Sequence, residues 1–303
     1  MFRLAHFSDV HLAPLPRPRL RDLASKRLIG YANWRFNRAR EMTAQSLDRL
    51  LADMRTHDPD HIVVTGDLAN IALRQEFEAA RYWLEMLGPP ADVTVIPGNH
   101  DAYVPGAHRQ YCRLWAPWMS GDDAGPGKDA SFPFIRRRNG VALIGVSSAI
   151  ASAPFMATGR LGRAQAETLA ALLQETGAEG LARIVLIHHP PQLMDWRGFT
   201  RRLTDARRLR SVIQIAGAEL VLHGHDHRAI TMTIAGPDGP VPVAGAAAGS
   251  GPPGGGHKPG GYAIHEISAD EGAFQVTVIH RCFDAEGTIV ETARDRFALS
   301  RRC

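Results

Sequence analysis

Short apolar runs recur along the chain with the length and composition of buried β-strands. The main ones lie at residues 4–7, 61–64, 93–96, 184–187 and 220–222. Runs rich in Val, Ile and Leu predict strands that are covered on both faces. Between them, apolar residues recur at helical spacing in residues 42–54, 76–87 and 164–174, which predicts amphipathic helices that face a core. The alternation of strands and helices indicates an α/β fold.

The second half of the chain adds further strand signals. Residues 132–147 predict two strands joined at Asn139-Gly140, a dipeptide typical of a tight hairpin turn. Beyond residue 228, residues 229–246, 261–267 and 273–280 predict more strands, and we expect the strand-rich part at about 229–303 to complete a second sheet. Without an internal repeat, we expect residues 1–303 to form a single domain. Glycine-rich residues 249–261 favour a flexible loop over a substrate flap.

Polar strings follow the five apolar runs, and they carry the candidate chemistry. The strings are Asp9-Val10-His11, Gly66-Asp67, Gly98-Asn99-His100-Asp101, His188-His189-Pro190-Pro191 and His223-Gly224-His225-Asp226-His227. Polar groups after the strands of an α/β fold gather at the strand ends of one sheet. Residues two apart in an extended segment point the same way, so each Asp-x-His or His-x-His pair can reach one site. A carboxylate between them in chain order, Asp67, has two oxygens with which to bridge two ions.

With these five strings in this order, the chain resembles the calcineurin-like metallophosphoesterases. The Gly-Asn-His-Asp, His-His-Pro-Pro and His-Gly-His-Asp-His forms are most similar to the branch of cyclic-nucleotide and glycerophosphodiester phosphodiesterases. The resemblance implies a four-layer α/β/β/α sandwich with a dinuclear metal site between the sheet edges. It assigns Asp9, His11, Asp67 and His227 to one metal ion, and Asp67, Asn99, His188 and His225 to the other. His188 is preferred to His189 as the ligand, although both fit the family pattern; His189 would then lie at the rim and contact substrate.

The implied chemistry is hydrolysis of a phosphoester. Two divalent ions lower the pKa of bound water and stabilise charge on the phosphoryl oxygens, while neutral histidines and two carboxylates leave the centre with a net positive charge. Imidazole, carboxylate and amide ligands without thiolate suit Mn, Fe, Zn or Co. His100 is the candidate acid for the leaving oxygen. Many relatives have an aspartate where this chain has Asn70, so we expect His100 to hold its proton less tightly, unless Asp101 supplies a carboxylate from another direction.

Composition fits a folded enzyme. The chain has 303 residues, 45% of them hydrophobic, which is enough for one large α/β domain. It contains no apolar run of the roughly 18 residues that a membrane span needs. The sequence enters its first predicted strand at once, so we expect no signal peptide and a cytoplasmic location. Its cysteines, Cys112, Cys282 and Cys303, lie outside every polar string, so we expect free thiols.

Positive charge is concentrated in two segments. Residues 14–41 hold eight basic residues against two acidic ones, while the whole chain has a net charge of only +4. A second cluster of six arginines lies at residues 195–210. Both segments follow ligand-bearing strands and carry aromatic and aliphatic residues, so both are expected to overhang the site. We interpret residues 14–41 as a basic-aromatic insert, and Arg197 and His257 as candidate substrate contacts.

These segments allow four interpretations. The arginines could be a solvated helix face, which is the usual fate of charge runs; a cationic rim that selects anionic substrates; a surface in peripheral contact with an anionic membrane at its inner face; or, less favoured, a nucleic-acid contact. The sequence therefore predicts a dinuclear phosphodiesterase that acts on a small anionic phosphodiester, of cyclic-nucleotide or glycerophosphodiester type. The alternative is a phospholipid or lipid-linked phosphodiester or pyrophosphate at a membrane surface. A nuclease or a non-catalytic regulatory protein is disfavoured, because no ligand is missing.

Overall fold

The computed structural model describes residues 1–38, 44–125, 127–193, 196–254, 258–270 and 272–300, with only the backbone of residues 37, 38, 44, 196 and 197. His257, Cys303 and the last residues of the insert lie outside the described residues. The strands are β1 (Phe2–Phe7), β2 (His61–Val64), β3 (Val93–Val95), β4 (Phe134–Arg138), β5 (Val141–Gly145), β6 (Ala182–Leu186), β7 (Leu220–His223), β8 (Ile230–Ala235), β9 (Pro240–Gly245), β10 (Gly261–Asp270), β11 (Ala273–Phe283) and β12 (Ile289–Ser300). The α-helices are α1 (Leu20–Leu23), α2 (Arg27–Asn33), α3 (Ala44–Arg55), α4 (Arg74–Leu87), α5 (Ala107–Leu114), α6 (Arg163–Ala178) and α7 (Ala206–Ala216), and a π-helical turn (Trp34–Arg38) continues α2.

Two mixed six-stranded sheets form the centre of the molecule. Their strand orders are β12-β11-β10-β1-β2-β3 and β4-β5-β6-β7-β9-β8. The predicted Asn139-Gly140 hairpin is confirmed: β4 and β5 pair antiparallel, and both turn residues have positive φ angles, 44° and 82°. The three amphipathic helices predicted from spacing are confirmed as α3, α4 and α6.

The predicted placement of the C-terminal strands is wrong in part. Only β8 and β9 join the second sheet, whereas β10, β11 and β12 extend the first sheet. Strand β10 pairs antiparallel with β1, whose other edge is occupied by β2. An apolar pattern reveals which faces of a strand are buried but not which edge it pairs with, so the sequence could not make this distinction.

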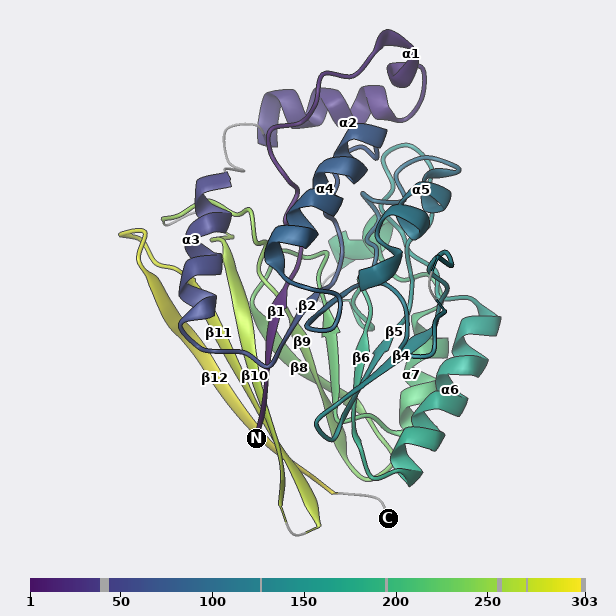
Figure 1. Cartoon of the computed structure of the whole chain (residues 1–303), viewed down its shortest axis with the longest axis vertical. Coiled ribbons are helices and arrows are strands. Elements are labelled where there is room, and N and C mark those ends of the chain that lie inside the picture. The colour runs from purple at the N-terminus through teal and green to yellow at the C-terminus, as the bar shows by residue number, and fades with distance from the viewer. Residues whose placement is uncertain (39–43, 126, 194–195, 255–257, 271, 301–303) are drawn as a thin grey trace.

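Three hydrophobic clusters separate four layers. One lies between the first sheet and helices α3, α4 and α5, the second between the second sheet and helices α6 and α7, and the third between the two sheets. Strand β1 serves two of them, because Leu4 packs between the sheets while Ala5 and Phe7 pack under the helices. The result is the α/β/β/α sandwich that the resemblance implied, with α6 and α7 on the opposite side from α3 and α4 (Figure 1).

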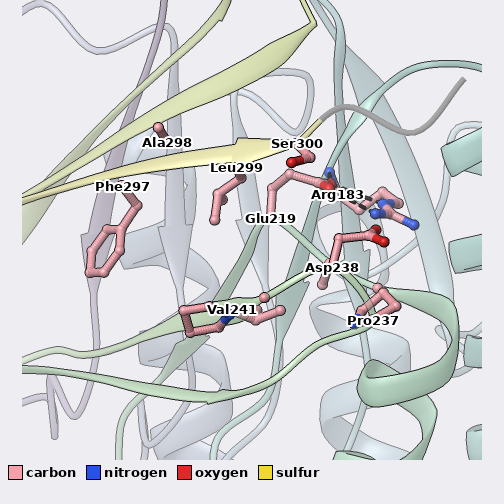
Figure 2. A pocket seen from close by; sticks show the side chains of 13 residues that line it. Arg183, Glu219, Pro237, Asp238, Val241, Phe297, Ala298, Leu299 and Ser300 are labelled. Carbon is pink, nitrogen blue, oxygen red and sulfur yellow. Dashed lines mark hydrogen bonds and ion pairs between the residues drawn. The ribbon is translucent and has the colours of Figure 1, made fainter.

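The insert occupies one end of this sandwich. Helices α1 and α2 lie beyond the end of β1, next to α4 (Figure 1). The opposite end, where β6 and β7 begin, holds a small pocket beside the last residues of β12 (Figure 2). There the Arg183 guanidinium forms a two-pronged ion pair with Glu219, at 2.7 and 2.9 Å, and donates a further bond to the Ala216 carbonyl. Because these charges are paired with each other, this end offers little to a ligand.

Candidate metal centre and active site

The five polar strings meet at the insert end of the sandwich. They follow β1, β2 and β3 of the first sheet and β6 and β7 of the second, so the expectation that a single sheet carries them all is wrong. Ligand atoms of three groups lie within 4.8 Å of one another: Asp9, His11 and His227; Asp67, His188 and His225; and His11, Asp67 and His100. The first two groups fall within the two ligand sets expected from the sequence, and Asp67 links the second to the third.

The backbone at this cluster is held in a conformation that most residues avoid. Five candidate ligands have positive φ angles: Asp9 (52°), His11 (37°), Asp67 (60°), His225 (73°) and His227 (54°). Such angles persist where surrounding contacts fix them, and they concentrate at functional sites. Close approach is also required at Gly98, because a Cβ there would lie 2.1 Å from Asp67 Oδ1. The glycine before Asn99 thus lets two loops touch.

Both carboxylates of the cluster are buried against histidines. Asp9 Oδ1 lies 3.1 Å from His227 Nε2, and Asp9 Oδ2 accepts a bond from the His225 backbone N–H at 2.9 Å. Asp67 Oδ2 lies 3.4 Å from His188 Nε2, and Asp67 Oδ1 accepts a 2.7 Å bond from the His100 backbone N–H. Burial alone would favour protonated carboxyls, but the neighbouring histidines outweigh it and lower the pKa of both.

The histidines of the cluster respond to these carboxylates unequally. Burial opposes charge on His188, yet Asp67 and Asp9 overcome it and raise the His188 pKa to about 9. Burial and the nearby His189 and His188 hold the pKa of His225 well below its ordinary value. The His225 Nε2 atom is buried and has no hydrogen-bond partner among the described residues. A buried imidazole nitrogen beside carboxylates, with no thiolate near, is the donor set that Mn, Fe, Zn or Co would take.

The choice between the two adjacent histidines can be made from their contacts. His188 Nδ1 bonds the Thr65 carbonyl, which leaves Nε2 beside Asp67 and 3.1 Å from Asn99 Oδ1. Both ring nitrogens of His189 are engaged elsewhere, by Ser148 Oγ at 2.7 Å and the Ala157 carbonyl at 3.1 Å. His188 is therefore the histidine with a nitrogen directed at the cluster, and His189 supports the loop that carries Ala157.

His100 stands at the edge of the cluster, half-buried, and lines a cavity of about 410 Å³. Its Nδ1 lies 2.5 Å from the main-chain carbonyl oxygen of Asn70, so the ring is oriented by backbone and not by the Asn70 side chain. The Asn70 amide nitrogen instead donates to the Leu12 carbonyl. Tyr103 stacks on the other side of the His100 ring, with centres 5.5 Å apart and planes 15° apart. The Tyr103 contact is one that spacing in the sequence could not reveal.

Asp101 and Glu76 hold the loops around His100. The two Asp101 oxygens accept bonds from the backbone N–H groups of Asp67, Ala69 and Gly98 at 2.8 to 2.9 Å. Burial and the Asp67 charge raise the Asp101 pKa to about 7. Glu76, equally buried, accepts from the backbone of Asn70, Ile71 and Leu73. Through these contacts Asp101 fixes the backbone of the loops that carry Asp67 and Asn99.

The insert forms a wall of the cavity. Lys26 Nζ donates to the Ser152 and Met156 carbonyls at 3.2 and 2.8 Å and lies 4.5 Å from the centre of the Tyr103 ring. Burial lowers the Lys26 pKa. Arg27 donates to the carbonyls of Ile71 and Ala72, next to Asn70.

Helix α2 could not sit this close with a larger residue at position 30. A Cβ at Gly30 would lie 2.6 Å from Tyr103 Oη and 2.7 Å from Ile71 Cγ2. The insert therefore touches both supports of His100, the Tyr103 ring and the turn that contains Asn70.

Two of the candidate substrate contacts, Arg197 and His257, cannot be placed in the cavity. The Arg197 side chain and His257 lie outside the described residues. From the same basic cluster, Arg201 does line the cavity and donates to the His225 carbonyl at 2.7 Å. Trp34 and Phe155 add apolar wall. Arg201 belongs to a segment that the sequence placed over the site, but its position within that segment could not be singled out from charge alone.

Comparison with known proteins agrees with this geometry. The family model for calcineurin-like phosphoesterases matches residues 2–229. A Synechococcus protein named "Probable cyclic nucleotide phosphodiesterase" is 26% identical over 231 residues, which cover 75% of this chain and 73% of that protein.

Solved structures share the fold at low sequence identity. A dimetal phosphatase from Danio rerio aligns with a TM-score of 0.60 at 12% identity, covering 99% of both chains. A purple acid phosphatase from yellow lupin also gives 0.60, at 14% identity, covering 99% of this chain and 54% of its own.

The chain belongs to the calcineurin-like phosphoesterase family and is a metal-dependent hydrolase of phosphoesters. Family and structure together give it a dinuclear metal-binding site of histidine and aspartate side chains. Among the described residues, no helix is both long and apolar enough to cross a membrane.

Proposed function

We propose that the chain is a dinuclear metallophosphodiesterase in which Asp67 is shared by the two ions. One ion would be held by Asp9, His11, Asp67 and His227, and the other by Asp67, Asn99, His188 and His225. The observation that carries this assignment is the position of Asp67, because its Oδ2 lies 3.4 Å from Nε2 of His188 in one proposed ligand set and 3.9 Å from Nε2 of His11 in the other. Divalent ions held there would supply Lewis acidity and would lower the pKa of water near the phosphoryl group.

His100 is the general acid for the leaving oxygen. The His100 ring lines the cavity and its Nδ1 lies at the Asn70 carbonyl, so Nε2 is the nitrogen that we assign to the leaving oxygen. When His100 is protonated, it donates the Nε2 proton to the departing alkoxide. Tyr103, Asp101 and Glu76 fix the ring and its loops, so that little reorganisation is needed in the transition state.

The substrate is a small organic phosphodiester of cyclic-nucleotide or glycerophosphodiester type. A cavity of about 410 Å³ suits a small molecule. Its lining pairs cations, Lys26 and Arg201, with an apolar wall from Trp34 and Phe155, as a phosphate attached to an organic group requires. The name of the Synechococcus relative supports the same class.

A second candidate substrate is a phospholipid or lipid-linked phosphodiester met at an anionic membrane from the cytoplasmic side. It is favoured by the exposure of Leu20, Phe36 and Phe155, at 89, 79 and 82%, on segments that also contribute residues to the cavity lining.

The test is metal analysis of the purified protein combined with hydrolysis of a panel of substrates. The panel contains an aryl diester, an aryl monoester, a cyclic nucleotide, a glycerophosphodiester and a phospholipid, each assayed with Mn, Fe, Zn and Co. We expect about two ions per chain and faster hydrolysis of diesters than of the monoester. A protein that binds fewer than two ions, or that prefers the monoester, would overturn the assignment.

A further inference from the structure

Exposed apolar side chains gather on the segments that border the cavity. Ten large hydrophobic residues are exposed among those described, and six belong to three such segments: Leu20, Leu28 and Phe36 of insert residues 14–38, Phe155 of the loop at 151–160, and Leu193 and Phe199 of residues 192–193 and 196–202. Single exposed apolar residues are ordinary on a protein surface. A concentration of them around one opening marks an interaction site.

These three segments form a continuous rim, because hydrogen bonds tie each to the next. The Lys26 side chain of the insert donates to the Ser152 and Met156 carbonyls of the 151–160 loop. The Ala157 backbone N–H of that loop donates to the Thr200 carbonyl at 2.9 Å. Lys26, Met156 and Thr200 all line the same cavity. We call this set of segments the rim.

Exposed arginines on the rim differ from those on helices α4 and α6 in having no carboxylate partner among the described residues. On helices α4 and α6, exposed arginines have a carboxylate one turn away, as in Arg74–Glu78, Arg81–Glu85 and Arg163–Glu167. On the rim, the exposed arginines form no ion pair with any described residue; they are Arg17, Arg19, Arg21, Arg35 and Arg160. The described part of the insert, residues 14–38, contains a single acidic residue, Asp22. The rim therefore presents cations that lack an anionic partner within the described chain.

We propose that the rim seats the protein on an anionic lipid surface, so that the cavity opens toward phosphodiester headgroups. Unpaired cations interleaved with leucine and phenylalanine are the composition that binds at such an interface, where apolar side chains enter the acyl boundary and arginines contact the headgroups. Aliphatic residues such as Leu20 and Leu28 offer nothing for nucleobase stacking, so nucleic acid is disfavoured. The proposal rests on the proposed function only for the identity of the substrate; the binding itself does not depend on catalysis.

The experiment measures sedimentation of the full-length, metal-loaded chain with vesicles of phosphatidylcholine alone or with phosphatidylglycerol added. A charge variant carries Arg17→Ser, Arg19→Ser and Arg21→Ser; its matched control carries Arg74→Ser, Arg81→Ser and Arg163→Ser. An apolar variant carries Leu20→Ser, Leu28→Ser and Phe36→Ser, residues that are 55 to 89% exposed. Its control carries Tyr82→Ser, Met86→Ser and Ile215→Ser, residues of α4 and α7 that are 63 to 70% exposed. Lys26 and Arg27 stay intact because they attach the insert.

We expect the wild type to bind acidic vesicles at low salt and to be released by added salt. At about 1 kcal/mol per basic residue near the surface, the charge variant should bind roughly a hundredfold more weakly. The apolar variant should lose at least tenfold, and both controls should bind as the wild type does. Absence of binding, equal binding to neutral and acidic vesicles, or equal losses in rim variants and controls would each overturn the proposal.

A second readout separates this proposal from the proposed function. Hydrolysis of a soluble aryl diester without vesicles should be the same in the wild type and in both rim variants, whereas hydrolysis of phosphatidylglycerol in vesicles should fall with binding. A chain that binds vesicles but hydrolyses no diester would sink the phosphodiesterase assignment and leave the docking surface standing. A chain that hydrolyses soluble diesters but does not bind vesicles would overturn the docking surface and leave the phosphodiesterase assignment standing.

Discussion

Two groups of buried histidines, one at the metal site and one between the sheets, show what the same side chain does in two settings. At the site, His188 and His227 lie within 3.4 Å of the Asp67 and Asp9 carboxylates. Between the sheets, His6 and His280 bond only threonine hydroxyls, at 2.9 and 3.0 Å, and neither nitrogen of His265 has a hydrogen-bond partner among the described residues. His188 is as fully buried as His6, His265 and His280, so the carboxylates beside it make the difference.

The consequence is visible in the pKa values. Despite burial, the neighbouring carboxylates raise the pKa of His188 to about 9, so this position attracts positive charge. Burial and the nearby His280 lower the pKa of His265 to about 3, and burial lowers that of His280 to about 4. No candidate metal group among the described residues includes the histidines between the sheets. A cluster of imidazoles becomes a cation site only when carboxylates accompany it.

The largest expected effect comes from removing the shared carboxylate. Asp67→Asn should lower diester hydrolysis by more than about a hundredfold, since even supporting residues of metal sites cost 10- to 100-fold when lost. It should also reduce the bound metal below two ions per chain, as measured by elemental analysis. The exposed Asp122→Asn serves as the control. Near-normal metal content and turnover in Asp67→Asn would show that the Asp67 carboxylate is not what makes the histidines at the site bind metal.

The histidines between the sheets should make the protein sensitive to acid. A histidine with a folded pKa of about 3 and an unfolded pKa near 6.5 stays neutral in the fold but is protonated in the unfolded chain between these values. The free energy of unfolding is therefore unaffected by His265 above about pH 6.5 and decreases as the pH falls from 6.5 toward 3. At pH 4.5 the loss from His265 alone is about 2–3 kcal/mol.

His265→Leu should abolish this share of the loss, as measured by urea unfolding of the metal-free protein at pH 4.5 and 7.5. Metal-free protein is used so that ions leaving the site do not contribute. The surface histidine variant His108→Leu is the control. An unchanged dependence of stability on pH in His265→Leu would mean that His265 is already protonated or hydrated in the fold.

A third variant tests how tightly the insert supports His100. Gly30→Ala would favour helix α2 by about 1 kcal/mol if the helix were free, because alanine is the better helix former. Against Tyr103 Oη and Ile71 Cγ2 it must instead displace the insert or the tyrosine. We expect turnover to fall by about tenfold, since a small misplacement of a catalytic group is costly. Ala32→Gly, on the same helix, is the control, and a more stable and fully active Gly30→Ala protein would refute the close contact.

The smallest effect is expected from adding a carboxylate near His100. From the sequence alone, Asn70→Asp would be expected to raise the turnover of diesters with poor leaving groups. The contacts change this expectation, because the carbonyl of Asn70 contacts the His100 ring whereas its side chain donates to the Leu12 carbonyl. The new carboxylate would instead lie near buried Glu76 and repel it. We expect less than about a threefold change in turnover and a loss of stability of roughly 1–3 kcal/mol. A selective gain for alkyl over aryl diesters would show that the side chain does reach His100.

The sequence predicted that the five polar strings meet, but it did not predict what surrounds them. The ligand strings were predictable because each follows an apolar strand, and strand ends converge. The bond from His100 to a main-chain carbonyl, the Tyr103 stack and the close approach at Gly30 depend on side chains brought together from distant segments. No local pattern encodes these contacts. The pairing of β10 with β1 was missed for a similar reason, because edges of sheets compete for strands without a signature in either strand.

The division of the candidate ligands between the sheets has a mechanical consequence. Asp9, Asp67 and Asn99 follow strands of the first sheet, whereas His188 and His225 follow strands of the second. Ions bound by ligands from both sheets would link the two sheets at the active-site end, while apolar packing holds the rest of the interface between them. Binding that favours the folded state raises its stability as the metal concentration rises. The melting temperature of the enzyme would then report metal supply, and a chelator would loosen the sandwich from the active-site end.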